Sequence, residues 1–264
     1  MTISILLERT DDLLQKLYQC LPDPNPTLLF ESTELANCAE QSPIWVDTTN
    51  QTSMLELMRG SPEAWPGLII ESHASQNAML SHLRHILIVR FGGERKGALR
   101  YSIPTTASYF FTVNNLQTSR TWMGPISRLS WYGGTWRDLA LGTQQWFNVE
   151  NPDAQKWQHS TERPPLHLDQ LQEQSLQRQQ KDHFVYLWWK KQADVSFNDA
   201  VDYLNQGIAN GFVEAQELEQ YLTLRSQHPS HTAPVIPLDN NSEDRLELLR
   251  QQLARDHQDK ESLT

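Results

Sequence analysis

Three histidines near the middle of the sequence are the residues best suited to chemistry. His82 and His85 are three positions apart, a spacing that puts both side chains on one face of a helix, and His73 precedes them. Together with Glu71, such residues could bind a metal ion. No H-E-x-x-H motif is present, however, and the same residues are typical of a helix C-terminus, where His side chains and Arg84 favour the negative end of the helix dipole.

The sequence lacks the other common catalytic and phosphate-binding motifs. There is no G-x-S-x-G motif, and neither Cys20 nor Cys38 stands beside residues that would mark it as a nucleophile. The glycines of GGERKG, residues 92–97, match neither the dinucleotide-binding nor the NTP-binding loop, so we interpret them as a turn between two strands. We therefore expect a protein that is not an enzyme and binds no cofactor or metal. A metal-dependent or serine-type hydrolase that uses the three histidines is the enzymatic alternative.

Composition limits the class of partner and the compartment. The 264 residues include 22 Lys or Arg and 32 Asp or Glu, and the resulting net charge of −10 argues against sequence-independent nucleic-acid binding. Two cysteines are too few for a disulfide framework in a chain of this size, so we expect both to be reduced thiols. No stretch approaches the roughly 20 apolar residues that span a bilayer, and the N-terminal apolar stretch is too short for a signal peptide. These features predict a soluble cytoplasmic protein with no membrane insertion.

Tryptophan is frequent in this sequence. There are nine tryptophans, and five of them lie between residues 122 and 157. Such residues either fill the core or line a partner surface, because tryptophan is favoured at binding hot spots. Trp189, in the run DHFVYLWWKK, is expected to lie off the apolar stripe of its helix. The candidate partner-binding tryptophans are Trp122, Trp131, Trp136 and Trp189.

The C-terminal segment offers a second candidate partner surface. Residues 242–260 predict an amphipathic helix whose narrow apolar stripe consists of Leu246, Leu249 and Leu253. An i, i+3, i+7 spacing is the pattern used when a helix binds in the groove of a partner. The sequence leaves open whether this helix docks on its own protein or on another chain.

The order of the predicted elements indicates an α/β protein of the α+β type. Strands are predicted over 27–32, 43–49, 65–72, 86–91 and 98–102, and helices over 10–20, 52–60 and 75–85. We expect the apolar run at 86–91 to be a central strand. The aromatic region 120–148 predicts short strands with turns at residues 124–125 and 133–134. This alternation predicts a mixed sheet with packed helices.

The composition changes after residue 157, and the sequence that follows is predicted to be helical. Helices are predicted over 168–193, 197–211 and 214–227, which together form a helical C-terminal lobe. The predicted domains are an α/β lobe over residues 1–160, a helical lobe over 161–230, and a linker with the terminal helix over 231–264.

A succession of motifs between about residue 27 and residue 131 resembles a known protein family. The motifs are PIWVDT, WPGLIIES, LSHLRHILIVR, a glycine-bearing hairpin with LRYS, and WMGPISRLSW. They are similar to segments of the cytoplasmic adaptor chaperones of type VI secretion effectors, the Tap or Tec proteins, which include the VasW-like adaptors. Residues 168–227, with GIANGFVEAQELEQYL, resemble the C-terminal lobe of the same family. One departure is IPTTASYF at 103–110, where the family usually carries Asp-Pro-Arg and this chain keeps only Pro104.

The resemblance implies protein binding and carries over no catalytic residues. Such adaptors bind the N-terminal part of a toxic effector and bring it to the VgrG spike, while they themselves stay in the cytoplasm. The partners implied for this chain are a type VI secretion effector and a VgrG protein. An immunity protein that neutralises a toxin is the alternative, because it too acts by binding another protein.

Overall fold

The computed structural model describes residues 1–21, 23–49, 52–113, 116–160, 163–229, 235–236 and 242–261. The chain divides into two compact units, Met1–Gln180 and Lys181–Thr264. The division falls inside helix α7 (Gln170–Trp189), later than the predicted domain boundary at residue 160. The residues just after 160 therefore belong to the first unit, and the terminal helix belongs to the second.

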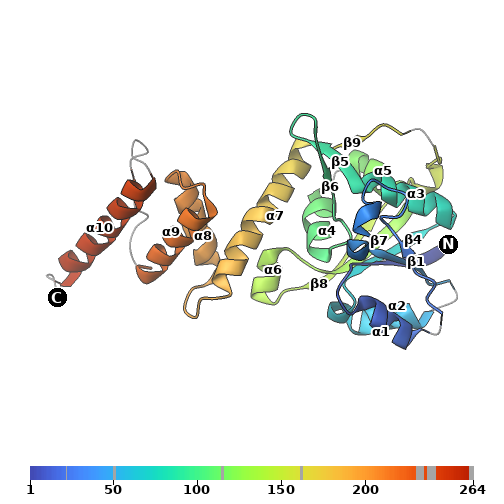
Figure 1. The fold of residues 1–264 in the computed structure, drawn as a ribbon, viewed down its shortest axis with the longest axis horizontal. Helices are drawn as coiled ribbons and strands as arrows, with labels where there is room; N and C mark the ends of the chain where they lie inside the picture. The colour runs from blue at the N-terminus through green and yellow to red at the C-terminus, as the bar shows by residue number, and fades with distance from the viewer. Residues whose placement is uncertain are drawn as a thin grey trace. The chain divides into compact units, whose positions relative to one another are not determined.

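A six-stranded sheet forms the centre of the first unit (Figure 1). Its strands lie in the order β2-β3-β1-β4-β7-β8, and every neighbouring pair is antiparallel. The strands are β1 (Thr2–Leu7), β2 (Thr27–Leu28), β3 (Ile44–Asp47), β4 (Gly67–Ser72), β7 (Ile126–Gly133) and β8 (Gln145–Glu150). The α+β class is confirmed, but this sheet is antiparallel throughout and not mixed as predicted.

Strand β1 was not predicted, although it pairs with both β3 and β4. Its consecutive buried residues Ile5, Leu6 and Leu7 hide the apolar–polar alternation that marks a half-buried strand. Alternate side chains still face opposite sides of the sheet, because Ile5 and Leu7 belong to one core cluster and Leu6 to the other. The sheet is therefore buried on both faces.

Helices cover the two faces of the sheet (Figure 1). The helices of the first unit are α1 (Leu13–Cys20), α2 (Thr52–Gly60), α3 (Gln76–Leu87), α4 (Pro104–Phe110), α5 (Leu116–Met123) and α6 (Trp136–Leu141). Leu13 and Leu17 of α1 and Met54 of α2 pack on the face that carries Ile5. On the opposite face the core includes residues of α3, α4 and α5, among them Leu83 of α3. The first unit thus has three layers, helices, sheet and helices.

The apolar run at 86–91 does not form a central strand of the main sheet. Helix α3 continues to Leu87, because Met79, Leu83 and Ile86 extend its buried stripe at helical spacing. Strand β5 (Ile88–Phe91) starts only afterwards and lies in a separate three-stranded sheet between β6 (Arg95–Ala98) and β9 (Leu166–His167). The pairing of β5 with β9 is parallel and that with β6 antiparallel, so mixed pairing occurs in this smaller sheet.

The region 99–150 contains more helix than the sequence indicated. The turns predicted at residues 124–125 and 133–134 are confirmed, since Gly124 ends α5 and β7 ends at Gly133. Helices α4, α5 and α6 were missed, because each is too short to show a clear helical period. Short 3-10 helices complete the unit at Ala36–Gln41, Pro62–Ala64, Phe111–Val113 and Ala154–Lys156.

An internal ion pair lies just before the segment that departs from the adaptor motif. Pro104 is the first residue of α4, a position where its missing N–H has no cost. Before it, Arg100 forms an ion pair with the buried Glu8, which also accepts a hydrogen bond of 2.5 Å from the Ser102 hydroxyl. Burial raises the pKa of Glu8, while Ser102 and Arg100 oppose that shift. This pair links the end of β1 to the chain that follows β6.

The second unit is helical. It contains the end of α7, then α8 (Phe197–Ala209), α9 (Ala215–Gln227) and α10 (Ser242–Glu261), close to the predicted helices. Gly207 lets α8 and α9 approach, since a Cβ atom there would lie 3.0 Å from the Tyr221 ring. Cys20 and Cys38 in the first unit are free thiols, as predicted.

Replacing Gly124 with alanine is expected to destabilise the first unit. Gly124 has a φ of +52°, and an added Cβ would lie 2.3 Å from His82 Cε1. The backbone conformation alone costs a non-glycine residue about 1–3 kcal/mol. Gly60→Ala is the matched control, because a Cβ at Gly60 meets nothing within 4 Å. Urea unfolding followed by circular dichroism measures both variants, and an equal midpoint for the two would contradict this account of the turn.

Candidate functional site

Two of the four candidate tryptophans lie in the core of the first unit. Trp122 is 2% exposed and Trp131 is fully buried. The Trp131 indole donates a hydrogen bond of 2.8 Å to the Ser108 hydroxyl and stacks on Phe147. These rings fill space between the sheet and its helices and present no surface to a partner.

The other two candidate tryptophans are half-buried. Trp136 begins α6, and its backbone N–H donates to the Tyr109 hydroxyl at 3.3 Å. In the second unit, the Trp189 indole donates to the Val195 carbonyl at 2.8 Å and packs edge-on against Phe197. The Trp189 ring therefore has contacts within its own unit, and both rings show only part of their surface.

The leucine stripe of the last helix faces its own unit. Leu246, Leu249 and Leu253 are all buried, with exposures of 6%, 0% and 2%. Helix α10 packs against α9, and the Arg245 guanidinium lies over the Phe212 ring, 5.1 Å from its centroid. Within the described residues, α10 therefore packs on its own unit through this stripe.

His82 has a structural role. It is 2% exposed, and its Nε2 lies 2.9 Å from the Trp122 carbonyl oxygen. That carbonyl can only accept, so Nε2 carries a proton. Burial is the main cause that lowers the pKa of His82 to about 4. This hydrogen bond connects α3 to the end of α5. The Nε2 atom of His82 is therefore not available to a substrate.

The other residues considered as an alternative metal site, His73, His85 and Glu71, are not brought together with His82. His73 and Glu71 border a cavity of about 300 Å³, but Glu71 lies 3.7 Å from the cationic Arg128. His85 borders a different cavity, together with Arg84. Among the residues that the structure describes, no group of three or more His, Cys, Asp or Glu side chains is placed to hold a metal ion.

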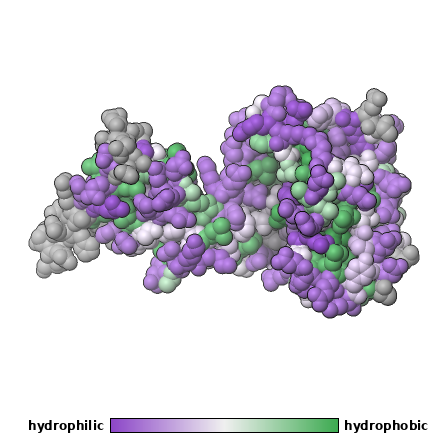
Figure 2. Space-filling model, viewed as in Figure 1, coloured by the Kyte–Doolittle hydropathy of each residue, from purple (hydrophilic) through white to green (hydrophobic). Residues whose placement is uncertain are grey.

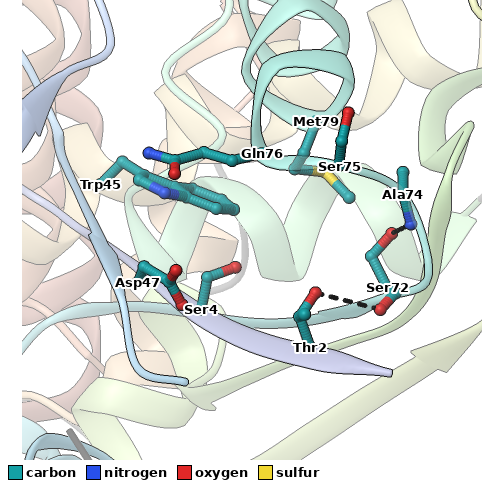
Figure 3. Close-up of a pocket in the computed structure, with 9 residues that line it drawn as sticks. All are labelled: Thr2, Ser4, Trp45, Asp47, Ser72, Ala74, Ser75, Gln76 and Met79. Carbon is teal, nitrogen blue, oxygen red and sulfur yellow. Dashed lines mark hydrogen bonds between the residues drawn. The ribbon is translucent and has the colours of Figure 1, made fainter. Parts of the chain in front are cut away.

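A small cavity lies at the N-terminus of α3 (Figure 3). Its volume is about 100 Å³, and the hydroxyls of Thr2, Ser4, Ser72 and Ser75 border it together with Trp45, Asp47, Ala74, Gln76 and Met79. Thr2 donates a hydrogen bond of 3.2 Å to the Ser72 carbonyl, and the Ser72 hydroxyl accepts one of 3.0 Å from the Ala74 N–H. The buried Trp45 indole N–H has no hydrogen-bond partner. A space of this size holds a few small polar groups, since a water takes up roughly 30 Å³ of liquid.

The largest cavity of the first unit that we describe is basic, and we call it the cationic cavity. Its volume is about 620 Å³, within the range of roughly 300–1,000 Å³ common to ligand sites. It is lined by Ser32, Thr33, Glu34, Arg84, His85, Ile88, Arg90, Lys96, Arg163 and Pro165. The lining residues come from the loop after β2, from α3, from β5 and β6, and from the segment before β9.

Three of the four cations in the cationic cavity have partners within the chain. Arg84 donates to the carbonyl of Leu29 at 3.1 Å, and Glu31 lies 3.9 Å away. Arg90 pairs with Glu94 at 2.6 Å across the β5–β6 turn. Lys96 pairs with Glu34. These contacts neutralise much of the charge of the three side chains.

Arg163 differs from the other three cations. Its Nε donates to the Ser160 carbonyl at 2.9 Å, and its guanidinium lies over the Trp157 ring, 4.9 Å from the centroid. Both terminal nitrogens are shielded from solvent and have no hydrogen-bond partner. Burial lowers the pKa of Arg163, and burial followed by the charge of Arg163 lowers the pKa of His85. The cationic cavity therefore contains one guanidinium whose charge and donors are not compensated within the described structure.

Local sequence patterns do not indicate this site. Arg84 and His85 were noted only as residues of a helix end, and Arg90, Lys96 and Arg163 were not singled out. The lining residues span positions 32 to 165, so their proximity depends on the fold and not on a local spacing. The glycine turn at 92–94 was one available signal, because it folds Arg90 and Lys96 to the same side of a hairpin.

The first unit is thus an α+β domain with a cationic cavity between its helices and its smaller sheet. Residues 6–120 match the model of a family described as "Domain of unknown function (DUF4123)". That stretch includes every residue that lines the cationic cavity except Arg163 and Pro165. Searches of curated proteins and of solved structures found no match. Within the described residues, every helix is too short or too polar to cross a bilayer.

Leu249→Ala is expected to destabilise the second unit by about 2–5 kcal/mol, the usual cost of truncating a buried leucine. Leu249 is fully buried, whereas Val235 is 83% exposed and supplies the matched control Val235→Ala. Hydrogen exchange of α8, α9 and α10 measures the effect in the second unit directly. If exchange in these helices is the same in both variants, α10 does not dock as described.

His82 is expected to make the protein less stable in mild acid. Its folded pKa of about 4 lies below its ordinary value of 6.5, so the unfolded chain binds the proton more readily. The stabilisation is complete above pH 6.5 and is lost as the pH falls toward 4, by up to about 3 kcal/mol.

Urea unfolding at several pH values between 7.5 and 4.5 tests this expectation. His82→Gln keeps a donor for the Trp122 carbonyl and should show a shallower loss of stability with acid than the wild-type chain. His73→Gln, at an exposed position, should follow the wild type. Identical pH profiles for all three proteins would show that His82 does not titrate as described.

Proposed function

We propose that this chain is an adaptor that binds a type VI secretion effector in the cytoplasm and helps to load it onto a VgrG spike protein. The observation that carries the proposal is the match of residues 6–120 to the DUF4123 family, which is associated with type VI secretion effector adaptors. The motifs from PIWVDT to WMGPISRLSW, which resemble such adaptors, overlap this stretch.

The arrangement of the site supports a role in binding. The three histidines considered for catalysis are separated, since His82 bonds a main-chain carbonyl while His73 and His85 border different cavities. The cationic cavity, in contrast, is large and carries an uncompensated charge. An adaptor needs such a recognition surface and no reacting group, so the proposed protein acts without chemistry of its own.

The surface of the protein also suits reversible contact. Hydrophilic residues cover most of the visible face of residues 1–180, with hydrophobic residues showing in patches (Figure 2). Binding interfaces combine apolar contacts with a polar rim in this way, and a polar surface keeps the free protein soluble. The candidate tryptophans contribute little to such an interface, because two are in the core and two are half-buried.

A pull-down from cells that carry a type VI secretion system tests the proposal. The tagged full-length chain is expected to recover an effector together with VgrG, as identified by mass spectrometry. Deleting the gene should abolish export of that effector, and restoring the gene should restore export. Recovery of neither partner, or export that is unchanged by the deletion, would contradict the adaptor function.

The same strain separates the adaptor from an immunity protein. An immunity protein protects a cell from incoming toxin and is not needed for export. The deletion strain is therefore expected to resist attack by its siblings as well as the parent does. Loss of resistance with normal export would identify the immunity function instead.

A further inference from the structure

We propose that the cationic cavity is an anchor site for an acidic segment of a partner polypeptide, with Arg163 binding a carboxylate through its terminal nitrogens. The inference rests on the proposed function for the nature of the partner, but the chemistry of the ligand comes from the cavity itself. Its four cations, Arg84, Arg90, Lys96 and Arg163, lie in a chain whose net charge is −10. A cationic site in an acidic protein is the arrangement expected where an anionic ligand binds.

The charges in and around the cavity define the ligand further. The four cations face three nearby carboxylates, Glu31, Glu34 and Glu94, which leaves one positive charge. Arg163 has no carboxylate partner among the described residues, so that excess charge lies on its guanidinium. A carboxylate carries one negative charge and matches this excess, and two parallel N–H donors of a guanidinium bind its two oxygens at once. A side-chain carboxylate of a peptide therefore fits better than a dianionic phosphate.

The geometry of Arg163 indicates how the carboxylate is reached. Its Nε is occupied by the Ser160 carbonyl, so the terminal pair of nitrogens is the edge left for a ligand. Those nitrogens are covered in the free protein while the residue borders the cavity, and the guanidinium rests on the Trp157 ring. Binding thus turns the guanidinium from the indole toward the cavity. The unpaired cation is unfavourable when buried, and a carboxylate removes that penalty.

The volume of the cavity favours a peptide over a single small anion. At about 620 Å³ it is large enough for more than one side chain. Arg90 and Lys96 already hold Glu94 and Glu34, and these exposed pairs can exchange partners at little cost. Several acidic residues in one segment can therefore use the same cavity.

Binding of a fluorescein-labelled hexaglutamate peptide to the full-length chain, followed by anisotropy at low salt, tests the proposal. Hexaglutamate is expected to bind, and hexaserine and hexalysine are not. Arg163→Gln should weaken the binding by about tenfold or more, because a buried charged contact is lost. Arg137→Gln removes the same charge from an exposed position of α6 and should bind as the wild type does.

Two further measurements distinguish a binding role of Arg163 from a structural one. Since its cation is unpaired, Arg163→Gln should leave the thermal midpoint unchanged or raise it. Hexaglutamate should change the intrinsic fluorescence of the wild-type chain, and Trp157→Phe should abolish most of that change. Equal binding by the wild type and Arg163→Gln, or displacement of the peptide by inorganic phosphate at equal concentration, would overturn the proposal.

The proposal and the adaptor function fail in different ways. If Arg163→Gln captures the effector as well as the wild type does, the anchor site is wrong and the adaptor function stands. If hexaglutamate binding depends on Arg163 but the chain recovers neither effector nor VgrG, the adaptor function is wrong and the anchor site stands.

Discussion

Helix α3 is held by hydrogen bonds between side chains and main-chain carbonyls. Two of its side chains bond carbonyls of distant segments, and one of its own carbonyls accepts a bond from a distant side chain. His82 bonds the carbonyl of Trp122, the Tyr101 hydroxyl donates to the carbonyl of Leu83, and Arg84 donates to the carbonyl of Leu29. A buried carbonyl that loses its partner costs about 1–3 kcal/mol, so each bond specifies one position of the helix. These three contacts bring α5, the chain after β6 and the chain after β2 to the same helix.

The position of the cationic cavity is a consequence of this arrangement. Arg84 and His85 lie two and three positions after His82 on α3, and the helix runs without a loop into β5, which supplies Arg90. The contact of Arg84 with the chain after β2 also places the loop that carries Glu34 at the rim. Once α3 is fixed, most of the cavity wall is fixed with it.

Two arginines of the first unit differ in how their charge is compensated. Arg100 meets Glu8, whose carboxylate is itself held by Ser102, so the charge of Arg100 is paired within the fold, although its buried Nε has no hydrogen-bond partner. Arg163 rests on an aromatic ring and meets no carboxylate among the described residues. A buried guanidinium without a carboxylate partner does not stabilise the fold. We therefore interpret Arg100 as a structural arginine and Arg163 as one available for binding.

Sequence patterns predicted the long amphipathic helices and the polar turns well, because these features are local. The helix over 52–60 and the turn at Gly124 were predicted correctly, whereas β1 was missed because both of its faces are buried. The strand predicted over 86–91 was half wrong, since an apolar run suits a buried helix and a buried strand equally.

The candidate site could not be predicted for a different reason. Arg84, Lys96 and Arg163 have no periodic relation in the sequence, and only tertiary structure brings them together. The choice between core and partner surface for Trp122 and Trp131 also depends on tertiary structure, because the residue type does not determine which side of a helix or strand is covered.

The two margins of the six-stranded sheet differ in length. Strand β2, at one margin, has only two residues, while β8, at the other, has six. An unpaired strand edge invites addition of a foreign strand, and short edges are one way in which proteins prevent it. The β8 margin therefore offers the longer unpaired edge. On β8 the residues Gln145, Asn148 and Glu150 are exposed. A neighbouring copy would therefore meet polar and charged side chains and not an apolar surface.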